Sequence, residues 1–110
     1  MKKILIADDH SIVRLGASII INEKFKNTEI INATTIEEVY NNLRDSKFDL
    51  LLLDINMPGG NNIKVVKEML DLQSDLKILI FSSYDENIYA LRFFEAGAAG
   101  FLNKNTAMGE

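Results

Sequence analysis

Leu50-Leu51-Leu52-Leu53-Asp54 is the stretch that decides the fold class of this chain, because four consecutive leucines lead directly into an acid. A short, continuously apolar run is typical of a parallel strand that is buried on both faces of its sheet. Further runs of this kind end at Asp8 and at Ser82. Strands are therefore expected at residues 3–7, 29–33, 49–53, 77–81 and 99–102.

Stretches with helical spacing separate these runs, which predicts an α/β fold with a parallel sheet between layers of helices. The first helix is expected after Ser11 as N-cap, and the second begins at Thr35, which has the capping-box spacing to Glu38. The third helix is expected from residue 62 to 72, and the fourth from residue 85 to Gly97, a residue type that accepts a left-handed C-cap. The expected inner face of the first helix consists of Ile12, Gly16, Ile19 and Ile20.

The chain has 110 residues, of which 47% are hydrophobic, so it is long enough for one core and too short for two. A single domain over residues 1–110 is therefore expected. The fifth strand needs a helix on each of its faces, and no closing helix follows Lys104 in the sequence. We expect the fifth helix to be missing or truncated, in a chain that is truncated at its C-terminus.

Composition excludes several classes of function. The net charge of −4 argues against nucleic-acid binding by this fragment, because such binding needs clustered Lys and Arg. Without cysteine and with a single histidine, a zinc centre is not expected, and any metal must use oxygen ligands. The first apolar run is too short for a signal peptide, and no run approaches a membrane span. We therefore expect a cytoplasmic protein without membrane contact.

The candidate functional residues are polar side chains at the ends of the apolar runs. Parallel strands place their carboxyl ends at one edge of the sheet, where ligands bind in α/β folds. Two carboxylates about 4 Å apart repel by about 4 kcal/mol at an effective dielectric constant of about 20. A hard divalent cation relieves this repulsion, and Mg²⁺ prefers carboxylates together with a phosphate. The residues concerned are Asp8, Asp9, Asp54, Ser82 and Lys104.

Four segments carry a family resemblance, in this order and at family-like spacing. They are Ile4-Leu5-Ile6-Ala7-Asp8-Asp9-His10, Leu51-Leu52-Leu53-Asp54-Ile55-Asn56-Met57-Pro58-Gly59, Ser82-Ser83 and the residues 96–104. With them the chain resembles the receiver domain of two-component response regulators, most closely the NarL, FixJ and LuxR types with a helix-turn-helix output domain. The resemblance implies a flavodoxin-like, doubly wound sheet with strand order 2-1-3-4-5.

The resemblance also implies roles for the acids at the sheet edge. Asp54 would be the phospho-acceptor, which takes a phosphoryl group from a sensor histidine kinase by nucleophilic attack. Asp9, Asp54 and the main-chain carbonyl of Asn56 would hold Mg²⁺, and Asp8 would act indirectly. His10 is expected to be a solvent-facing loop residue without a role, since one histidine offers little to magnesium.

Three further residues would respond to the phosphoryl group. Lys104 and Ser82 would contact it, and Ser82 and Phe101 would form the conformational switch. The switch would control a DNA-binding output domain that residues 1–110 do not include, and hence transcription. A homodimer is a further possibility, because the fourth helix carries the adjacent apolar residues Phe93 and Phe94.

Two other classes of protein remain alternatives. A phosphohydrolase of the haloacid dehalogenase type also uses Mg²⁺ and a nucleophilic aspartate at a strand end, but it needs a second acid where this chain has Asn56. A flavodoxin-like flavin binder would meet repulsion from three carboxylates at the position of the flavin phosphate. The sequence therefore favours a switch over an enzyme with turnover.

Overall fold

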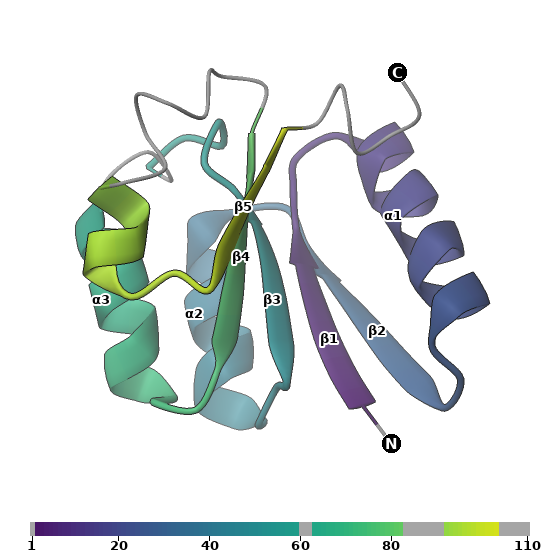
Figure 1. Cartoon of the computed structure of the whole chain (residues 1–110), viewed down its shortest axis with the longest axis horizontal. Helices are drawn as coiled ribbons and strands as arrows, with labels where there is room; N and C mark the ends of the chain where they lie inside the picture. Colours follow the sequence, from purple (N-terminus) through teal and green to yellow (C-terminus); the bar gives the residue numbers. More distant parts are fainter. Residues whose placement is uncertain (1, 60–62, 83–91, 104–110) are drawn as a thin grey trace.

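The computed structural model describes residues 2–59, 63–82 and 92–103. Five parallel strands form one sheet in the order β2-β1-β3-β4-β5, which confirms the flavodoxin-like, doubly wound α/β fold (Figure 1). The strands are β1 (Lys2–Ala7), β2 (Thr28–Ala33), β3 (Leu50–Asp54), β4 (Lys77–Ser82) and β5 (Gly100–Asn103).

The helices form a layer on each side of this sheet. They are α1 (Ser11–Lys24), α2 (Ile36–Asp45) and α3 (Ile63–Leu72), and residues 92–96 are also helical. Of the described helices in Figure 1, α1 lies on one face of the sheet, whereas α2, α3 and the 92–96 segment lie on the other face. The start of the expected fourth helix and the position of the fifth lie outside the described residues. Within the described part of the chain, no helix is long and apolar enough to cross a membrane.

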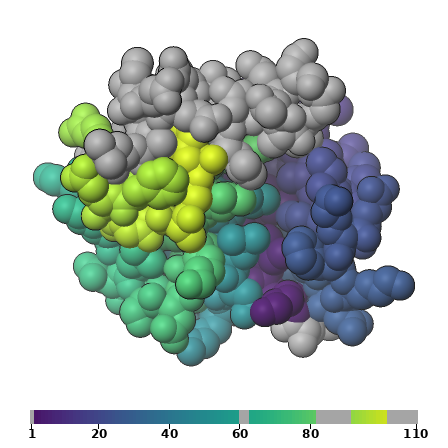
Figure 2. All heavy atoms as spheres, viewed as in Figure 1, coloured from purple at the N-terminus to yellow at the C-terminus, as the bar shows by residue number. Residues whose placement is uncertain are grey.

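The central strand β3 is buried on both faces, as its run of leucines predicts. Leu51 and Leu53 belong to the larger core cluster, on the side of α2 and α3, and Leu52 belongs to the smaller cluster under α1. Leu50 and Leu79 are only partly buried on the α1 face. Figure 2 shows strand atoms at the surface between α1 and the C-terminal part of the sheet. Among the described residues, the face of the sheet under α1 is therefore covered less completely than the face under α2 and α3.

Helix α1 differs from the expectation in two ways. It begins at Ser11 itself, and His10 is its N-cap residue, without a capping hydrogen bond from the side chain. Its buried residues are Ala17 and Ile21, whereas Ile12 is 74% exposed and Ile19 is 51% exposed. The predicted inner face was wrong because apolar residues surround much of this helix, so that spacing alone does not select one face.

The ends of α2 and of the 92–96 segment follow the predicted chemistry. The Thr35 hydroxyl accepts a 3.1 Å hydrogen bond from the Glu38 backbone N–H, which confirms the N-cap. The Glu38 carboxylate instead accepts from Thr34, at 2.6 Å from the backbone N–H and 3.0 Å from the hydroxyl. Gly97 has a φ of 114°, in the left-handed half of the backbone map, as expected for a helix C-terminus.

The apolar pair of the fourth helix is divided between core and surface. Phe93 is buried in the larger core cluster, and Phe94 is 45% exposed. The predicted apolar surface at this helix is therefore wrong for Phe93, because neighbouring residues of a helix point in different directions.

Candidate functional site

The sheet register brings the predicted acids to one edge. Ala7 of β1 pairs with Leu53 of β3, so that Asp8 and Asp54 follow at the same level of two adjacent strands. The chain crosses from β1 to β2 on one side and reaches β3 on the other, so the strand order reverses at this point. In doubly wound sheets such a reversal leaves a crevice beyond the carboxyl ends of the strands.

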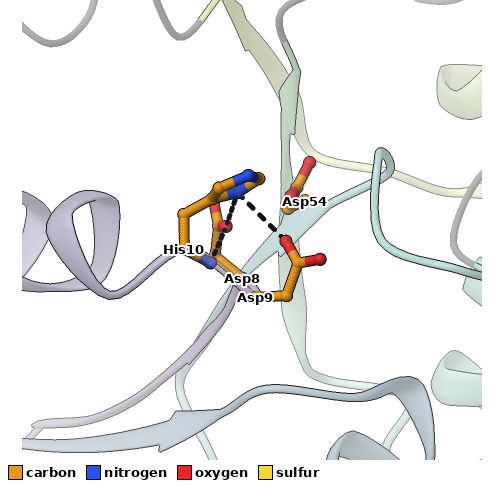
Figure 3. Close-up of side chains that lie close together, drawn as sticks. All are labelled: Asp8, Asp9, His10 and Asp54. Atoms are coloured by element: carbon orange, nitrogen blue, oxygen red, sulfur yellow. Dashed lines mark hydrogen bonds and ion pairs between the residues drawn. The ribbon is translucent and has the colours of Figure 1, made fainter.

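Four side chains converge in this crevice (Figure 3). Asp8, Asp9, His10 and Asp54 each offer one atom able to ligate a metal, and these atoms all lie within 4.8 Å of one another. Asp8 is 1% exposed and Asp54 is completely buried, whereas Asp9 and His10 reach the solvent. The cluster therefore has buried carboxylates at its base and solvent-accessible groups at its rim.

Backbone groups orient the two buried carboxylates. The N–H of Asn56 donates a 2.8 Å hydrogen bond to Oδ1 of Asp54, and the N–H of His10 donates one of 2.8 Å to Oδ1 of Asp8. The guanidinium of Arg14, one turn into α1, donates to the Asp8 carbonyl oxygen at 2.8 Å. These contacts tie the start of α1 to the end of β1, and so fix the backbone beneath the cluster.

His10 belongs to the cluster, although no role is expected for it from the sequence. Its Nδ1 lies 2.9 Å from Oδ1 of Asp8 and 3.0 Å from Oδ1 of Asp9. The side chain is 60% exposed, so the prediction that it faces solvent is correct while its ring also bridges two acids. A signal was present in the sequence, because a strand end followed by Asp-Asp-His brings three polar side chains to one loop.

Three of the four other predicted site residues lie in the described part of the chain. Ser82 is the last residue of β4, next to β3, where Asp54 pairs with Phe81. Phe101 lies in β5, is partly buried, and packs against the larger core cluster. Asn56 follows Asp54 in the turn after β3. Lys104 lies outside the described residues.

The donor set fits a hard divalent cation. Three carboxylates within a few ångströms of one another repel strongly, and a cation among them would remove that cost. Carboxylate oxygens are the ligands that Mg²⁺ and Ca²⁺ prefer, and the exposed rim gives an ion from solution a way in.

Comparison with known proteins decides the family, because residues 4–110 match the response regulator receiver domain. The chain is a member of the response regulator receiver family. The receiver resembles the oxygen regulatory protein NreC of Staphylococcus epidermidis, with 33% identity over 94% of this chain and 48% of NreC. It spans about half the length of the curated relatives it matches. Receiver domains are signalling modules of response regulators.

Solved structures agree with this assignment. A LuxR-family two-component response regulator from Aurantimonas is 30% identical, with a TM-score of 0.84 over 98% of this receiver and 77% of that chain. The response regulator TrrA of Thermotoga maritima, solved in complex with magnesium and beryllium fluoride, is 29% identical. Its TM-score is 0.74 over 94% of this receiver and 86% of TrrA. The predicted similarity to receivers of the LuxR type is confirmed.

Proposed function

We propose that this receiver accepts a phosphoryl group on Asp54 from a phosphohistidine of a sensor histidine kinase, with Mg²⁺ as cofactor. The observation that carries the proposal is the position of Asp54, fully buried at the end of β3 with Asp8 and Asp9 in the same cluster. A buried carboxylate among other acids lowers the stability of the fold. Clusters of this kind therefore mark positions at which the carboxylates have a function.

In the proposed reaction, a carboxylate oxygen of Asp54 attacks the phosphorus atom. The new P–O bond forms as the P–N bond to the kinase histidine breaks, and the leaving imidazole keeps the bonding electron pair and takes up a proton. The hydrogen bond from the Asn56 N–H holds the carboxylate in place during attack. When bound, Mg²⁺ supplies the positive charge that stabilises the phosphoryl oxygens in the transition state.

The cation would be held by Asp9, Asp54 and the main-chain carbonyl of Asn56. Asp8 would act indirectly, since it is buried and its Oδ1 already accepts a hydrogen bond from the His10 backbone N–H. Asp9 is the more exposed of the two acids after β1 and can reach an ion that arrives from solvent. The different roles proposed for Asp8 and Asp9 are supported by their burial and hydrogen bonds, together with the family resemblance.

The conformational response would involve Lys104, Ser82 and Phe101. Lys104 would pair with a phosphoryl oxygen, and Ser82 would donate its hydroxyl to another. Phe101 would then change its packing against the core, which it contacts from β5. The charge of a phosphoryl group on Asp54 would thereby favour one of two conformations of the segments that carry Ser82 and Phe101. The domain would act as a conformational switch and not as an enzyme with catalytic turnover.

In the intact protein, this switch would control a DNA-binding output domain and thus transcription. The proposal follows the LuxR-family relative and the shared receiver fold. A homodimer is part of it, with the exposed apolar side chain of Phe94 on the fourth helix as an available contact. With a sensor histidine kinase as its partner, the receiver would act in the cytoplasm.

Phosphorylation by a small donor tests the proposed function. The protein is incubated with Mg²⁺ and acetyl phosphate, and its intact mass is measured. We expect the gain of one phosphoryl group that requires Mg²⁺ and is absent in Asp54→Asn, while the exposed-site variant Asp45→Asn gains it normally. Rapid turnover of a phosphomonoester without a stable adduct would support the phosphohydrolase instead.

A further inference from the structure

We propose that His10 is a nitrogen ligand of the divalent cation at the acidic cluster, and that it shifts the metal preference of the site from Mg²⁺ toward later first-row ions. The inference rests on the proposed function for the presence of a cation. It adds to the carboxylates a ligand of a different chemical class, the imidazole nitrogen of His10.

The position of the imidazole carries the inference. Nδ1 of His10 lies 2.9 Å from a carboxylate oxygen of Asp8 and 3.0 Å from one of Asp9. In an octahedral site with bonds of about 2.1 Å, neighbouring ligand atoms are about 3.0 Å apart. The nitrogen and the Asp9 oxygen thus already have the mutual spacing of adjacent ligands. One ligand atom each from Asp9, His10 and Asp54 lies within 4.8 Å of the others.

The backbone holds this ring in place. His10 is the N-cap residue of α1, and its carbonyl accepts the first hydrogen bond of that helix, from Arg14 N–H at 3.1 Å. Its own N–H is bonded to Oδ1 of Asp8. Both peptide groups of the residue are therefore fixed, and the ring turns back over the acids (Figure 3). A ligand that is ordered beforehand loses less conformational entropy on metal binding.

The chemistry of imidazole predicts the change in preference. Mg²⁺ prefers oxygen ligands and retains water, whereas imidazole nitrogen suits the later first-row ions. Cobalt and nickel should therefore gain more from His10 than magnesium does. The His10 side chain is 60% exposed, which places the ring at the rim of the cluster, where an ion would enter from solvent.

Manganese provides a direct test, because Mn²⁺ can occupy such a site and pulsed electron paramagnetic resonance detects ¹⁴N in its first shell. His10 is the only histidine of the chain, so an imidazole signal from untagged protein can come from no other residue. We expect an imidazole ¹⁴N coupling in the Mn²⁺-loaded protein. Labelling His10 with ¹⁵N should replace the ¹⁴N coupling by a ¹⁵N coupling. This change would assign the signal to His10 without a substitution in the protein.

Two variants and one affinity measurement complete the test. The coupling should vanish in His10→Asn, whose amide can still donate to Asp8 but offers no imidazole nitrogen, and in Asp54→Asn. Calorimetry should show Co²⁺ affinity weakened by about tenfold in His10→Asn, with a much smaller change for Mg²⁺. Bound Mn²⁺ without ¹⁴N coupling would overturn the role of His10 alone, and a coupling that survives Asp54→Asn would place the metal elsewhere. Failure of the protein to bind Mn²⁺ would overturn the proposed metal site as well.

Discussion

The backbone N–H of Asn56 donates a 2.8 Å hydrogen bond to Oδ1 of Asp54, from a turn that begins as β3 ends. The bond spans only two residues, so the strand end and its turn orient the carboxylate by themselves. A reacting group that is oriented in advance avoids part of the entropic cost of reaching its transition state. The proposed phospho-acceptor is therefore set in position before a kinase binds.

The crowded acids should make the metal-free protein less stable than it could be. Asp54→Asn removes one negative charge from a cluster whose ligand atoms lie within 4.8 Å of one another. We expect the free energy of unfolding without metal to rise by about 1–3 kcal/mol, from relief of this repulsion. Urea denaturation measures the change, and Asp45→Asn, an exposed site on α2, serves as the control.

Bound metal should offset this difference in stability between the original protein and Asp54→Asn. Magnesium at 100 times its dissociation constant stabilises a folded protein by about 2.7 kcal/mol, and Asp54→Asn should lose most of this gain. A variant that is less stable than the original protein without metal would contradict the repulsion, and equal stabilisation of both by Mg²⁺ would contradict Asp54 as a ligand.

Gln73 should contribute strongly to stability. Its amide nitrogen donates to the carbonyl oxygens of Leu43, at 2.8 Å, and of Ser46, and its oxygen accepts from the Phe48 N–H at 2.9 Å. One side chain, directly after α3, thus joins the end of α2 and the loop that follows it. We expect Gln73→Ala to lower the free energy of unfolding by about 2–3 kcal/mol, since partly buried backbone groups lose their partners.

The neighbouring exposed Ser74 offers a matched control for this loss. Ser74→Ala should change stability by less than about 0.5 kcal/mol in the same urea titration. Similar values for the two variants would show that the bonds of Gln73 contribute nothing specific.

Glu38 should make stability depend on pH in the acid range. Hydrogen bonds from the Thr34 backbone N–H and hydroxyl hold the pKa of this carboxyl below its usual 4.5. Because the folded-state pKa is lowered, the contribution is present above the unfolded-state pKa and is lost as pH falls through the folded-state value. Glu38→Gln should therefore lose less stability than the original protein between about pH 6 and about pH 3. Thermal melts across this range test it, with Glu37→Gln as the control; identical slopes for Glu38→Gln and the original protein would refute the coupling.

Gly97 should disfavour an added side chain. Its φ of 114° is rarely adopted by other residues, and an added Cβ would lie 2.5 Å from Cδ1 of Leu70. Gly97→Ala should cost more than the roughly 1–2 kcal/mol of a left-handed residue alone, because of the additional clash. Gly59→Ala separates the two effects, since φ is also positive there but its Cβ would meet Ile36 at 3.9 Å, an ordinary contact. Equal losses in both variants would show that packing against Leu70 is unimportant.

The sequence predicted the sheet and the acidic edge because both depend on local patterns. An apolar run such as 50–53 needs burial on two faces, and parallel strands place Asp8 and Asp54 at one edge whatever the details of packing. The inner face of α1 and the role of Gln73 depend on tertiary contacts far along the chain, which periodicity does not encode. The place of His10 in the cluster could not be predicted, because the direction of its side chain depends on contacts with Asp8 and Asp9 that the sequence pattern does not encode.

The most direct test of the central claim is to locate the phosphoryl group in the chain. The protein is phosphorylated with acetyl phosphate and Mg²⁺, treated with sodium borohydride, which reduces an aspartyl phosphate to homoserine, and sequenced by tandem mass spectrometry. The account predicts homoserine at position 54 and aspartate at positions 8 and 9. Reduction at position 8 or 9 with aspartate retained at position 54 would contradict it.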